Sequence, residues 1–282
     1  MKVCIYGAGA IGGYLGARLG LGGQVSLSAM ARGATLAALQ QHGFRLGSEH
    51  GEQAVPVRAV ADAAELGVQD LVIVAVKGPA MAAVAQGIGP LLGPDTVVLA
   101  ALNGVPWWFS SGVAALGPGP LQSVDPGGHI AEAIAPSRVL GCVVHASTST
   151  PEPGRIAAPR GRGLIIGEAC GGLSARLTSV ADLLSHAGFE VTQSADVRRE
   201  LWYKLWGNLT TNPVSALTGA TVDRILADPQ LRDWCTTLME EAAQVGERIG
   251  CRIEQSPADR HRITASLGAF KTSMLQDVEA GR

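Results

Sequence analysis

The sequence has little charge and no excess of either sign. Lys and Arg together number 22 against 24 Asp and Glu, and charged residues make up 16% of the 282 positions. Proteins that bind nucleic acid need clustered basic residues, whereas the basic residues here are scattered and form no runs. We therefore expect no DNA, no RNA and no anionic membrane surface as a partner.

Cysteines and long apolar runs are also scarce. The cysteines are odd in number, lie far apart and never have the two-residue spacing of metal or redox motifs: Cys4, Cys142, Cys170, Cys235 and Cys251. This argues against a disulfide framework and a zinc site, and predicts reduced thiols. The longest apolar runs, such as residues 71–76, are too short to span a bilayer. No basic leader precedes the strand-like residues 2–6. We expect a soluble cytoplasmic protein without a bound metal.

Apolar residues, in contrast, are abundant at 47%, which is enough for one large core or two modest ones. Short β-branched runs alternate with Ala- and Leu-rich segments over the first two-thirds of the chain. Strands are predicted at residues 3–6, 25–27, 71–76, 96–102 and 139–145, and helices at 13–19, 34–41, 79–92 and 106–116. Continuous apolar strands alternating with helices indicate a doubly wound, parallel α/β sheet.

The predicted secondary structure changes near residue 194, from strands alternating with helices to helices alone. Before it, residues 117–137 are rich in Gly and Pro and predict a loop, residues 155–167 predict further strands, and residues 174–187 predict a helix. After it, helices are predicted at 197–209, 229–249 and 257–277, with no strand between them. We therefore expect a Rossmann-type domain at residues 1–194 and an all-helical domain at 195–282.

A glycine-rich turn follows the first predicted strand and opens a helix. It consists of Gly7, Ala8, Gly9, Ala10, Ile11 and Gly12. In such a turn the first glycine allows the tight bend, the second lets the backbone approach a pyrophosphate, and the third lets helix and strand pack closely. Free N–H groups at the helix start then face the phosphates. A glycine pattern alone is weak in a chain with 37 glycines, but its position after the first strand predicts dinucleotide binding.

The end of the second predicted strand indicates which nucleotide binds. NAD-binding proteins place an acid there for the ribose hydroxyls, but residues 28–33 contain none and offer Arg32 instead. A guanidinium suits a 2′-phosphate, so the pattern favours NADP(H). Lys77, after the 71–76 run, is a second candidate for phosphate contact. A solvated surface arginine and a lysine that only ends a strand are the ordinary alternatives.

At this point the sequence resembles the ketopantoate reductase (2-dehydropantoate 2-reductase) family, from its first residue to its last. The resemblance rests on short segments in a specific order: residues 7–12, Arg32, residues 75–77, 102–104 and 199–205, Asn208, Asn212 with Pro213, and residues 271–277. It implies reduction of a branched 2-oxo acid by NADPH. It also implies that Lys204 is the catalytic lysine, that Asn103 contacts cofactor and substrate, and that Asn208, Asn212 and Ser273 line the substrate site.

Helix geometry supports part of this implication independently. Lys204, Asn208 and Asn212 are four residues apart and fall on one stripe of a helix. Apolar residues occupy another face, namely Leu201, Trp202, Leu205, Trp206 and Leu209. Ketone reduction needs a donor that protonates the oxygen while hydride reaches the carbon, and a lysine can serve. A solvated Lys204 paired with Glu200, a bend at Asn212 and an ordinary helix serine at Ser273 are the structural alternatives.

The sequence also departs from the family pattern. The resemblance implies a further segment after Arg282 with an acidic residue that handles substrate and, in some relatives, an asparagine near residues 219–222 that has no counterpart here. The exact 2-oxo acid therefore stays open, as does a homodimer through the helical domain. A non-catalytic NADP(H)-binding sensor and an SAM-dependent methyltransferase remain as alternatives. The Trp107–Trp108 pair is expected to pack in a core or an interface, and His129 and His145 are expected to be structural.

Overall fold

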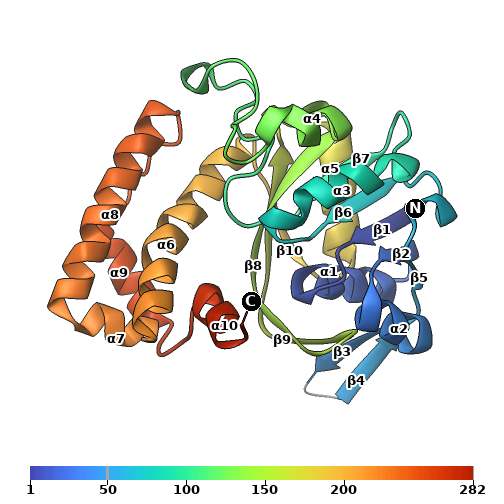
Figure 1. The fold of residues 1–282 in the computed structure, drawn as a ribbon, viewed down its shortest axis with the longest axis horizontal. Coiled ribbons are helices and arrows are strands. Elements are labelled where there is room, and N and C mark those ends of the chain that lie inside the picture. The colour runs from blue at the N-terminus through green and yellow to red at the C-terminus, as the bar shows by residue number, and fades with distance from the viewer. Residues whose placement is uncertain (49–50, 282) are drawn as a thin grey trace. The chain divides into compact units, whose positions relative to one another are not determined.

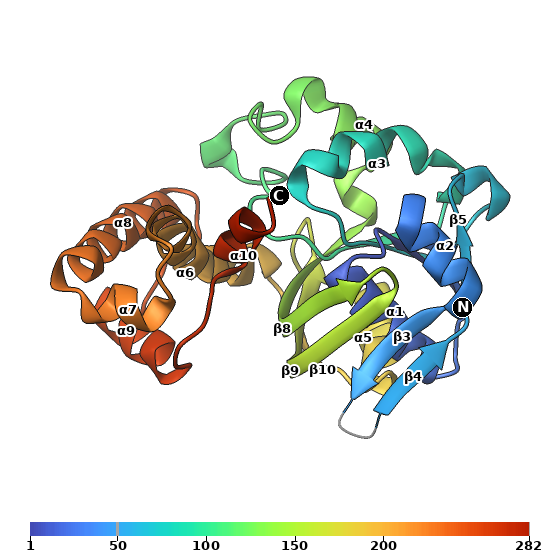
Figure 2. The same ribbon diagram turned by 60° about the horizontal axis from the view of Figure 1, so that its bottom comes forward.

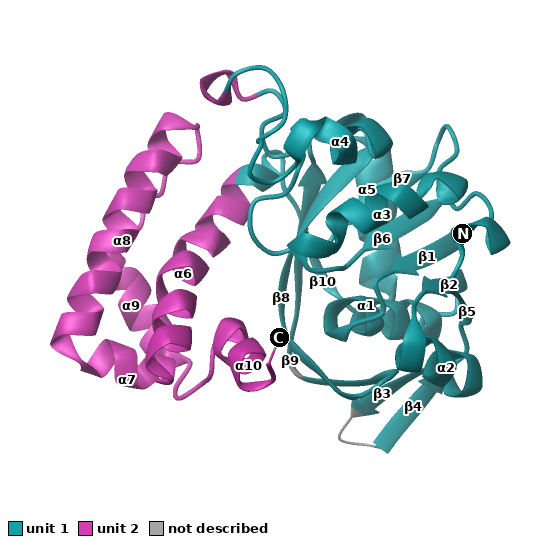
Figure 3. Ribbon diagram, in the orientation of Figure 1, with its two compact units in different colours: residues 1–112, 117–198 teal, residues 113–116, 199–282 magenta. Residues whose placement is uncertain are grey.

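The computed structural model describes residues 1–48 and 51–281 (Figure 1). The chain divides into two compact units (Figure 3). Unit 1 comprises residues 1–112 and 117–198, and unit 2 comprises residues 113–116 and 199–282. The boundary between the units, after Arg198, lies inside the helix that begins at Val197. It is four residues beyond the boundary at residue 194 predicted from the sequence.

Unit 1 contains a ten-stranded sheet with a parallel central part. The parallel strands lie in the order β5 (Arg58–Val60), β2 (Ser26–Met30), β1 (Lys2–Tyr6), β6 (Leu71–Val74), β7 (Val97–Ala100) and β8 (Val139–Glu152). Every residue of β6 and β7 is buried, as strands covered on both faces require. The predicted Rossmann-type sheet is confirmed.

The sheet continues past β8 with strands of mixed direction. β9 (Arg155–Glu168) runs antiparallel to β8, and β10 (Glu190–Gln193) runs parallel to β9. β3 (Phe44–Ser48) pairs with the first residues of β9, and β4 (Gly51–Val55) pairs with β3. Helix α1 (Ala10–Leu21) packs against β1 and β2 as well as β3, β4, β8 and β9, so the sheet curls around it (Figure 2).

Glycines in α1 allow this enclosure. A Cβ on Gly16 would lie 2.8 Å from the Phe44 ring and 2.9 Å from the Ile5 side chain, and one on Gly20 would lie 2.2 Å from Val55. Glycine inside a helix costs about 1 kcal/mol relative to alanine. The cost is offset here because the helix backbone comes within contact distance of β1, β3 and β4.

Four strands escaped the sequence analysis. β3, β4, β5 and β10 are short, and none carries a long apolar run; in β4 the residues before Val55 are exposed. Short strands without a continuous apolar run give no strong hydrophobic signal, which is why the pattern that identified the central strands did not identify these four. The connection between β3 and β4 includes residues outside the described ranges.

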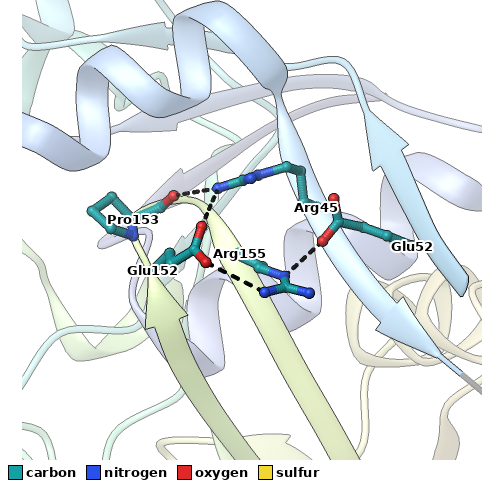
Figure 4. A network of polar contacts seen from close by, with 5 residues as sticks. All are labelled: Arg45, Glu52, Glu152, Pro153 and Arg155. Atoms are coloured by element: carbon teal, nitrogen blue, oxygen red, sulfur yellow. Dashed lines mark hydrogen bonds and ion pairs between the residues drawn. The ribbon is translucent and has the colours of Figure 1, made fainter.

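Four charged side chains join the β3–β4 pair to the β8–β9 turn (Figure 4). Arg155 donates from Nε to Glu52 Oε2 at 2.7 Å and from Nη1 to Glu152 Oε1 at 3.3 Å. Arg45 donates from Nη2 to the Pro153 carbonyl at 3.0 Å and lies 3.6 Å from Glu152. Exposed ion pairs contribute only about 0–1 kcal/mol each, so this network mainly fixes which edges of the curled sheet meet.

The remaining helices of unit 1 are α2 (Gly33–His42), α3 (Met81–Gly87), α4 (His129–Ala133) and α5 (Ala175–His186). The predicted helix at residues 106–116 is wrong: this stretch forms turns and one 3-10 turn, Ala114–Leu116. Trp107 and Trp108 are buried there, as predicted, and Gly112 has a φ of 75° that interrupts any helix. The predicted loop at 117–137 contains α4, because the Asp125 carboxylate accepts bonds from the backbone N–H groups of two of its residues, Ile130 and Ala131.

The regular secondary structure of unit 2, within its described residues, is entirely helical. It contains α6 (Val197–Thr218) from Arg199 onward, α7 (Val222–Ala227), α8 (Pro229–Arg248), α9 (Pro257–Ser266) and α10 (Ser273–Glu279). The single helix predicted at 257–277 is wrong, because Gly268 takes a φ of 77° and Thr272 caps a new helix by accepting from Leu275 N. None of the described helices is long and apolar enough to cross a bilayer.

The core of unit 2 forms around Trp206 on α6. Its ring is fully buried with Met239 of α8, and its Nε1 donates to the Met239 carbonyl at 2.8 Å. Leu201 and Trp202 are also buried, as the apolar stripe predicted. The other two predicted members, Leu205 and Leu209, are half-buried.

Candidate active site

The predicted cofactor residues of unit 1 meet at one edge of the sheet. The last residues of four parallel strands pair in register, namely Tyr6, Met30, Val74 and Ala100. The segments that leave these strands start at the same level, the carboxyl edge where α/β proteins bind their ligands. Gly7 directly follows β1, Arg32 lies two residues past β2, Lys77 lies three past β6, and Asn103 lies three past β7.

The three glycines of the turn have different structural reasons. Gly7 takes a φ of 103°, which glycine adopts without strain. A Cβ on Gly12 would lie 2.0 Å from the Gly7 carbonyl oxygen, so the turn itself requires glycine there. A Cβ on Gly9 would meet no protein atom within 4 Å. The space above Gly9 is open, as expected where a ligand approaches the backbone.

The start of α1 is available to an anion. Gly9 is the N-cap residue and supplies no side-chain cap, and the first turn contains no acidic residue. The N–H groups at the start of a helix have no partner within the helix, and the helix dipole is positive at that end. Together with the open space at Gly9, this arrangement fits the pyrophosphate of a dinucleotide.

Three exposed polar residues follow the strands at this edge: Arg32, Lys77 and Asn103. Arg32 is the N-cap residue of α2 and does not cap it through its side chain. Burial raises the pKa of the Tyr6 hydroxyl at the end of β1, and the positive charge of Arg32 opposes that rise. Because β1 and β2 are neighbouring parallel strands, Arg32 follows its strand at the same edge as the glycine turn.

The predicted substrate residues belong to unit 2. Lys204, Asn208 and Asn212 are half-buried along α6, one turn apart from each other. Ser273 is the first residue of α10 and is exposed. The apolar side of α6 is held by Trp206, so the stripe with Lys204 points away from that core.

The sequence analysis did not single out Arg260 of α9, which packs against α6. Its guanidinium carbon is 4.9 Å from the centre of the Tyr203 ring, and Tyr203 donates its hydroxyl to Gln255 Oε1 at 2.7 Å. The available signal was Gly207, a glycine in the middle of a long helix between Lys204 and Asn208. Arg260 itself lies too far along the chain for the spacing to connect it with them.

No group of three or more His, Cys, Asp and Glu side chains within the described ranges is arranged to hold a metal ion. His129 is exposed and lies 3.8 Å from Glu132, and both side chains are at least 80% exposed. His145 is exposed on β8. The candidate groups are the glycine turn and the polar side chains of the sheet edge in unit 1 and, separately, the stripe on α6 in unit 2.

Comparison with known proteins shows that both units match models of one protein family. Residues 3–108 match the family model described as ketopantoate reductase PanE/ApbA, and residues 196–282 match the model of its C-terminal part. The chain belongs to the ketopantoate reductase family. Members of this family are oxidoreductases that use a nicotinamide cofactor, so membership decides against an SAM-dependent methyltransferase.

Relatives of the family resemble the chain over its whole length. The 2-dehydropantoate 2-reductase of Mesorhizobium japonicum is 45% identical over 287 aligned residues, covering 100% of this chain and 87% of that protein. A crystal structure from Ralstonia solanacearum MolK2 that carries the family name is 54% identical, with a TM-score of 0.94 over 99% of this chain and 85% of that one. The 2-dehydropantoate 2-reductase of Geobacter metallireducens GS-15 is 26% identical, with a TM-score of 0.85 over 100% and 88%.

Proposed function

We propose that this ketopantoate reductase family member reduces 2-dehydropantoate to pantoate with NADPH. The observation that carries the proposal is the stripe of Lys204, Asn208 and Asn212 on α6, in a chain 45% identical over its full length to a protein named 2-dehydropantoate 2-reductase. In this proposal residues 1–194 hold the cofactor, and residues 195–282 supply the catalytic and substrate-binding side chains.

The choice of NADPH over NADH follows from the residues after β2. No carboxylate is present at residues 28–33 to accept the ribose hydroxyls, and the exposed Arg32 stands at that edge instead. A planar guanidinium can donate two parallel hydrogen bonds to a phosphate. Lys77, exposed after β6, adds a second positive charge at the same edge, and Asn103 serves both cofactor and substrate.

Lys204 acts as the general acid. When bound, the reduced nicotinamide supplies the hydride that reaches the ketone carbon. Negative charge then grows on the ketone oxygen, and the Lys204 ammonium donates a hydrogen bond and then its proton to that oxygen, so that an alcohol forms. Asn103, Asn208, Asn212 and Ser273 orient the oxo acid through their amide and hydroxyl groups.

Replacing Lys204 by alanine tests this assignment. We expect kcat to fall by about 10²–10⁴, the usual contribution of a general acid, while NADPH binding measured by fluorescence titration stays close to wild type. Lys271→Ala is the matched control, because the Lys271 ammonium on the same unit pairs with Glu279 at 2.7 Å. Near wild-type turnover in Lys204→Ala would contradict the role of Lys204.

The identity of the oxo acid is tested separately. Steady-state rates of NADPH oxidation across a panel of 2-oxo acids should give the highest kcat/KM for 2-dehydropantoate. A higher value for another 2-oxo acid would change the substrate and leave the roles of Lys204 and Arg32 intact. NADPH binding without oxidation by any member of the panel would favour a sensor.

A further inference from the structure

Gly207 makes room for a positive charge beside the stripe that carries Lys204. A Cβ at Gly207 would lie 2.7 Å from Nη2 of Arg260 and 3.2 Å from its Nε. A glycine inside α6 destabilises the helix by about 1 kcal/mol relative to alanine. The close approach of the Arg260 guanidinium accounts for a glycine at this position.

Packing holds Arg260 in place. The guanidinium carbon sits 4.9 Å from the centre of the Tyr203 ring, within the range of a cation–π contact. The ring itself is fixed, because the Tyr203 hydroxyl donates to Gln255 Oε1 at 2.7 Å. The guanidinium is therefore held between an aromatic ring and the α6 backbone at Gly207.

No carboxylate neutralises this charge among the residues that the structure describes. The Nε atom of Arg260 is buried and has no hydrogen-bond partner, and the guanidinium takes part in no ion pair within residues 1–48 and 51–281. On the same helix, Arg262 is paired with Asp259. A buried donor without a partner costs about 1–3 kcal/mol, and the packing against Gly207 and Tyr203 holds the guanidinium in place in spite of that cost.

We propose that Arg260 binds the carboxylate of the 2-oxo acid substrate, which makes it a residue that determines specificity for acids over neutral ketones. The inference rests on the proposed function of Lys204. In a 2-oxo acid the carboxylate carbon is bonded directly to the ketone carbon, so the group that binds the carboxylate must lie close to the group that protonates the ketone oxygen. Gly207, against which Arg260 packs, is three residues from Lys204, and residues with this spacing are neighbours on a helix surface.

The guanidinium suits this role chemically. Its fork of N–H donors matches the two oxygens of a carboxylate, and hydrogen bonds between two charged groups are about twice as strong as neutral ones. Lys204 donates to the ketone oxygen in this arrangement, and Asn208, next to Gly207 in sequence, is available for the remaining polar groups of the substrate.

The test compares a 2-oxo acid with its uncharged amide as substrates of NADPH oxidation. Arg260→Met keeps an unbranched side chain against Tyr203 and removes the charge. We expect its kcat/KM for 2-dehydropantoate to fall about 10- to 100-fold, the effect of losing a charge-assisted hydrogen bond, and its kcat/KM for the corresponding 2-oxo amide to stay within about twofold. Arg262→Met, on the same helix, is the control and should resemble wild type with both substrates.

A second variant leaves every charged group in the chain. Gly207→Ala places a Cβ where the guanidinium now lies, so it should displace Arg260 and raise the KM for the acid with little effect on the amide. Arg260→Lys, which keeps the charge but lacks the fork, should show an intermediate loss and is the variant to use if Arg260→Met does not fold. Equal losses for acid and amide in these variants would overturn the inference and assign Arg260 a packing role.

Failure of the proposed function gives a different result. If none of the tested 2-oxo acids supports NADPH oxidation by the wild-type protein, the proposed reaction is wrong. Calorimetric titration of 2-dehydropantoate into the NADPH-bound wild-type protein and Arg260→Met then decides the role of Arg260. Weaker binding to the variant supports the inference, whereas equal binding, or no binding to either protein, overturns it.

Discussion

A Cβ atom on Gly12 would lie 2.0 Å from the carbonyl oxygen of Gly7, inside the turn that joins β1 to α1. Gly9 lies between them in the same motif, yet a Cβ there would meet no protein atom within 4 Å. The two glycines therefore serve different purposes. Gly12 is needed by the fold of the turn, and Gly9 keeps open the space above the start of α1.

This difference predicts opposite phenotypes for two alanine variants. Gly12→Ala should destabilise unit 1, because a side-chain atom at 2.0 Å from backbone forces the turn apart. Gly9→Ala should keep the wild-type unfolding midpoint, since its φ of −78° and ψ of −160° suit alanine, but it should bind NADPH at least about tenfold more weakly. Thermal unfolding and fluorescence titration measure the two effects. Unchanged NADPH affinity in Gly9→Ala would argue against pyrophosphate binding at this turn.

Arg32 should control the choice between the two nicotinamide dinucleotides. Arg32→Ala should raise the KM for NADPH by about 10- to 100-fold through loss of charge-assisted hydrogen bonds, and change the KM for NADH much less. Arg58→Ala is the control, because the Arg58 guanidinium on β5 already donates to the Glu65 carbonyl at 2.7 Å. The same change in KM for both cofactors would show that Arg32 does not read the 2′-phosphate.

The ion pair of Glu168 and Arg176 should make stability depend on acid pH. Burial alone would raise the pKa of the Glu168 carboxyl, but hydrogen bonds from Arg176 and Ser174 outweigh it and hold the pKa below its usual value. Arg176 Nε donates to Glu168 Oε1 at 2.9 Å. Because the pKa is lower in the folded chain, the stabilisation is fully present above the unfolded value of about 4.3 and is lost as pH falls through the folded value.

Urea unfolding of wild type and Glu168→Gln checks this expectation. At pH 7 the variant should be less stable by about 1–3 kcal/mol, the cost of replacing a charged hydrogen-bond partner. The difference should shrink as pH falls below the unfolded value of about 4.3 and the wild-type carboxyl becomes protonated. A difference that is constant across this range would mean that shape, and not charge, is what Glu168 contributes.

Cysteine reactivity should differ sharply along the chain. Cys170 is exposed, whereas Cys4 is fully buried, and burial raises the pKa of the Cys4 thiol to about 12. The thiolate is the reactive form, so a thiol-specific alkylating reagent at pH 8 should label native protein at Cys170 and reach Cys4 only after unfolding. Mass spectrometry of digested protein reads out both sites. Rapid labelling of Cys4 in the native state would contradict its burial.

Much of the central fold could be predicted from sequence because its signals are local. Buried parallel strands such as β6 and β7 are continuous apolar runs, and the change to helical periodicity marks the second half of the chain. Edge strands such as β4 and β5 have no such signal. The helix expected at residues 106–116 failed for a related reason, since burial of Trp107 and Trp108 produced the apolar pattern without a helix.

The candidate site divides in the same way. The glycine turn, Arg32 and the stripe of Lys204 on α6 follow from short spacings whose geometry is set by the backbone of a single turn or helix. These features the sequence determined by itself. The alignment of Arg32, Lys77 and Asn103 at one edge depends on the register of four strands, and hydrogen bonds between distant segments set that register.

Tertiary structure alone decided two further features. The curl of the sheet around α1 brings Gly16 against Phe44 and Gly20 against Val55. In unit 2, the guanidinium of Arg260 packs against Gly207. In each case a glycine is informative only once its contact is known, because an absent side chain does not specify what occupies its place. Packing between segments far apart in the chain supplies that information, and no local pattern contains it.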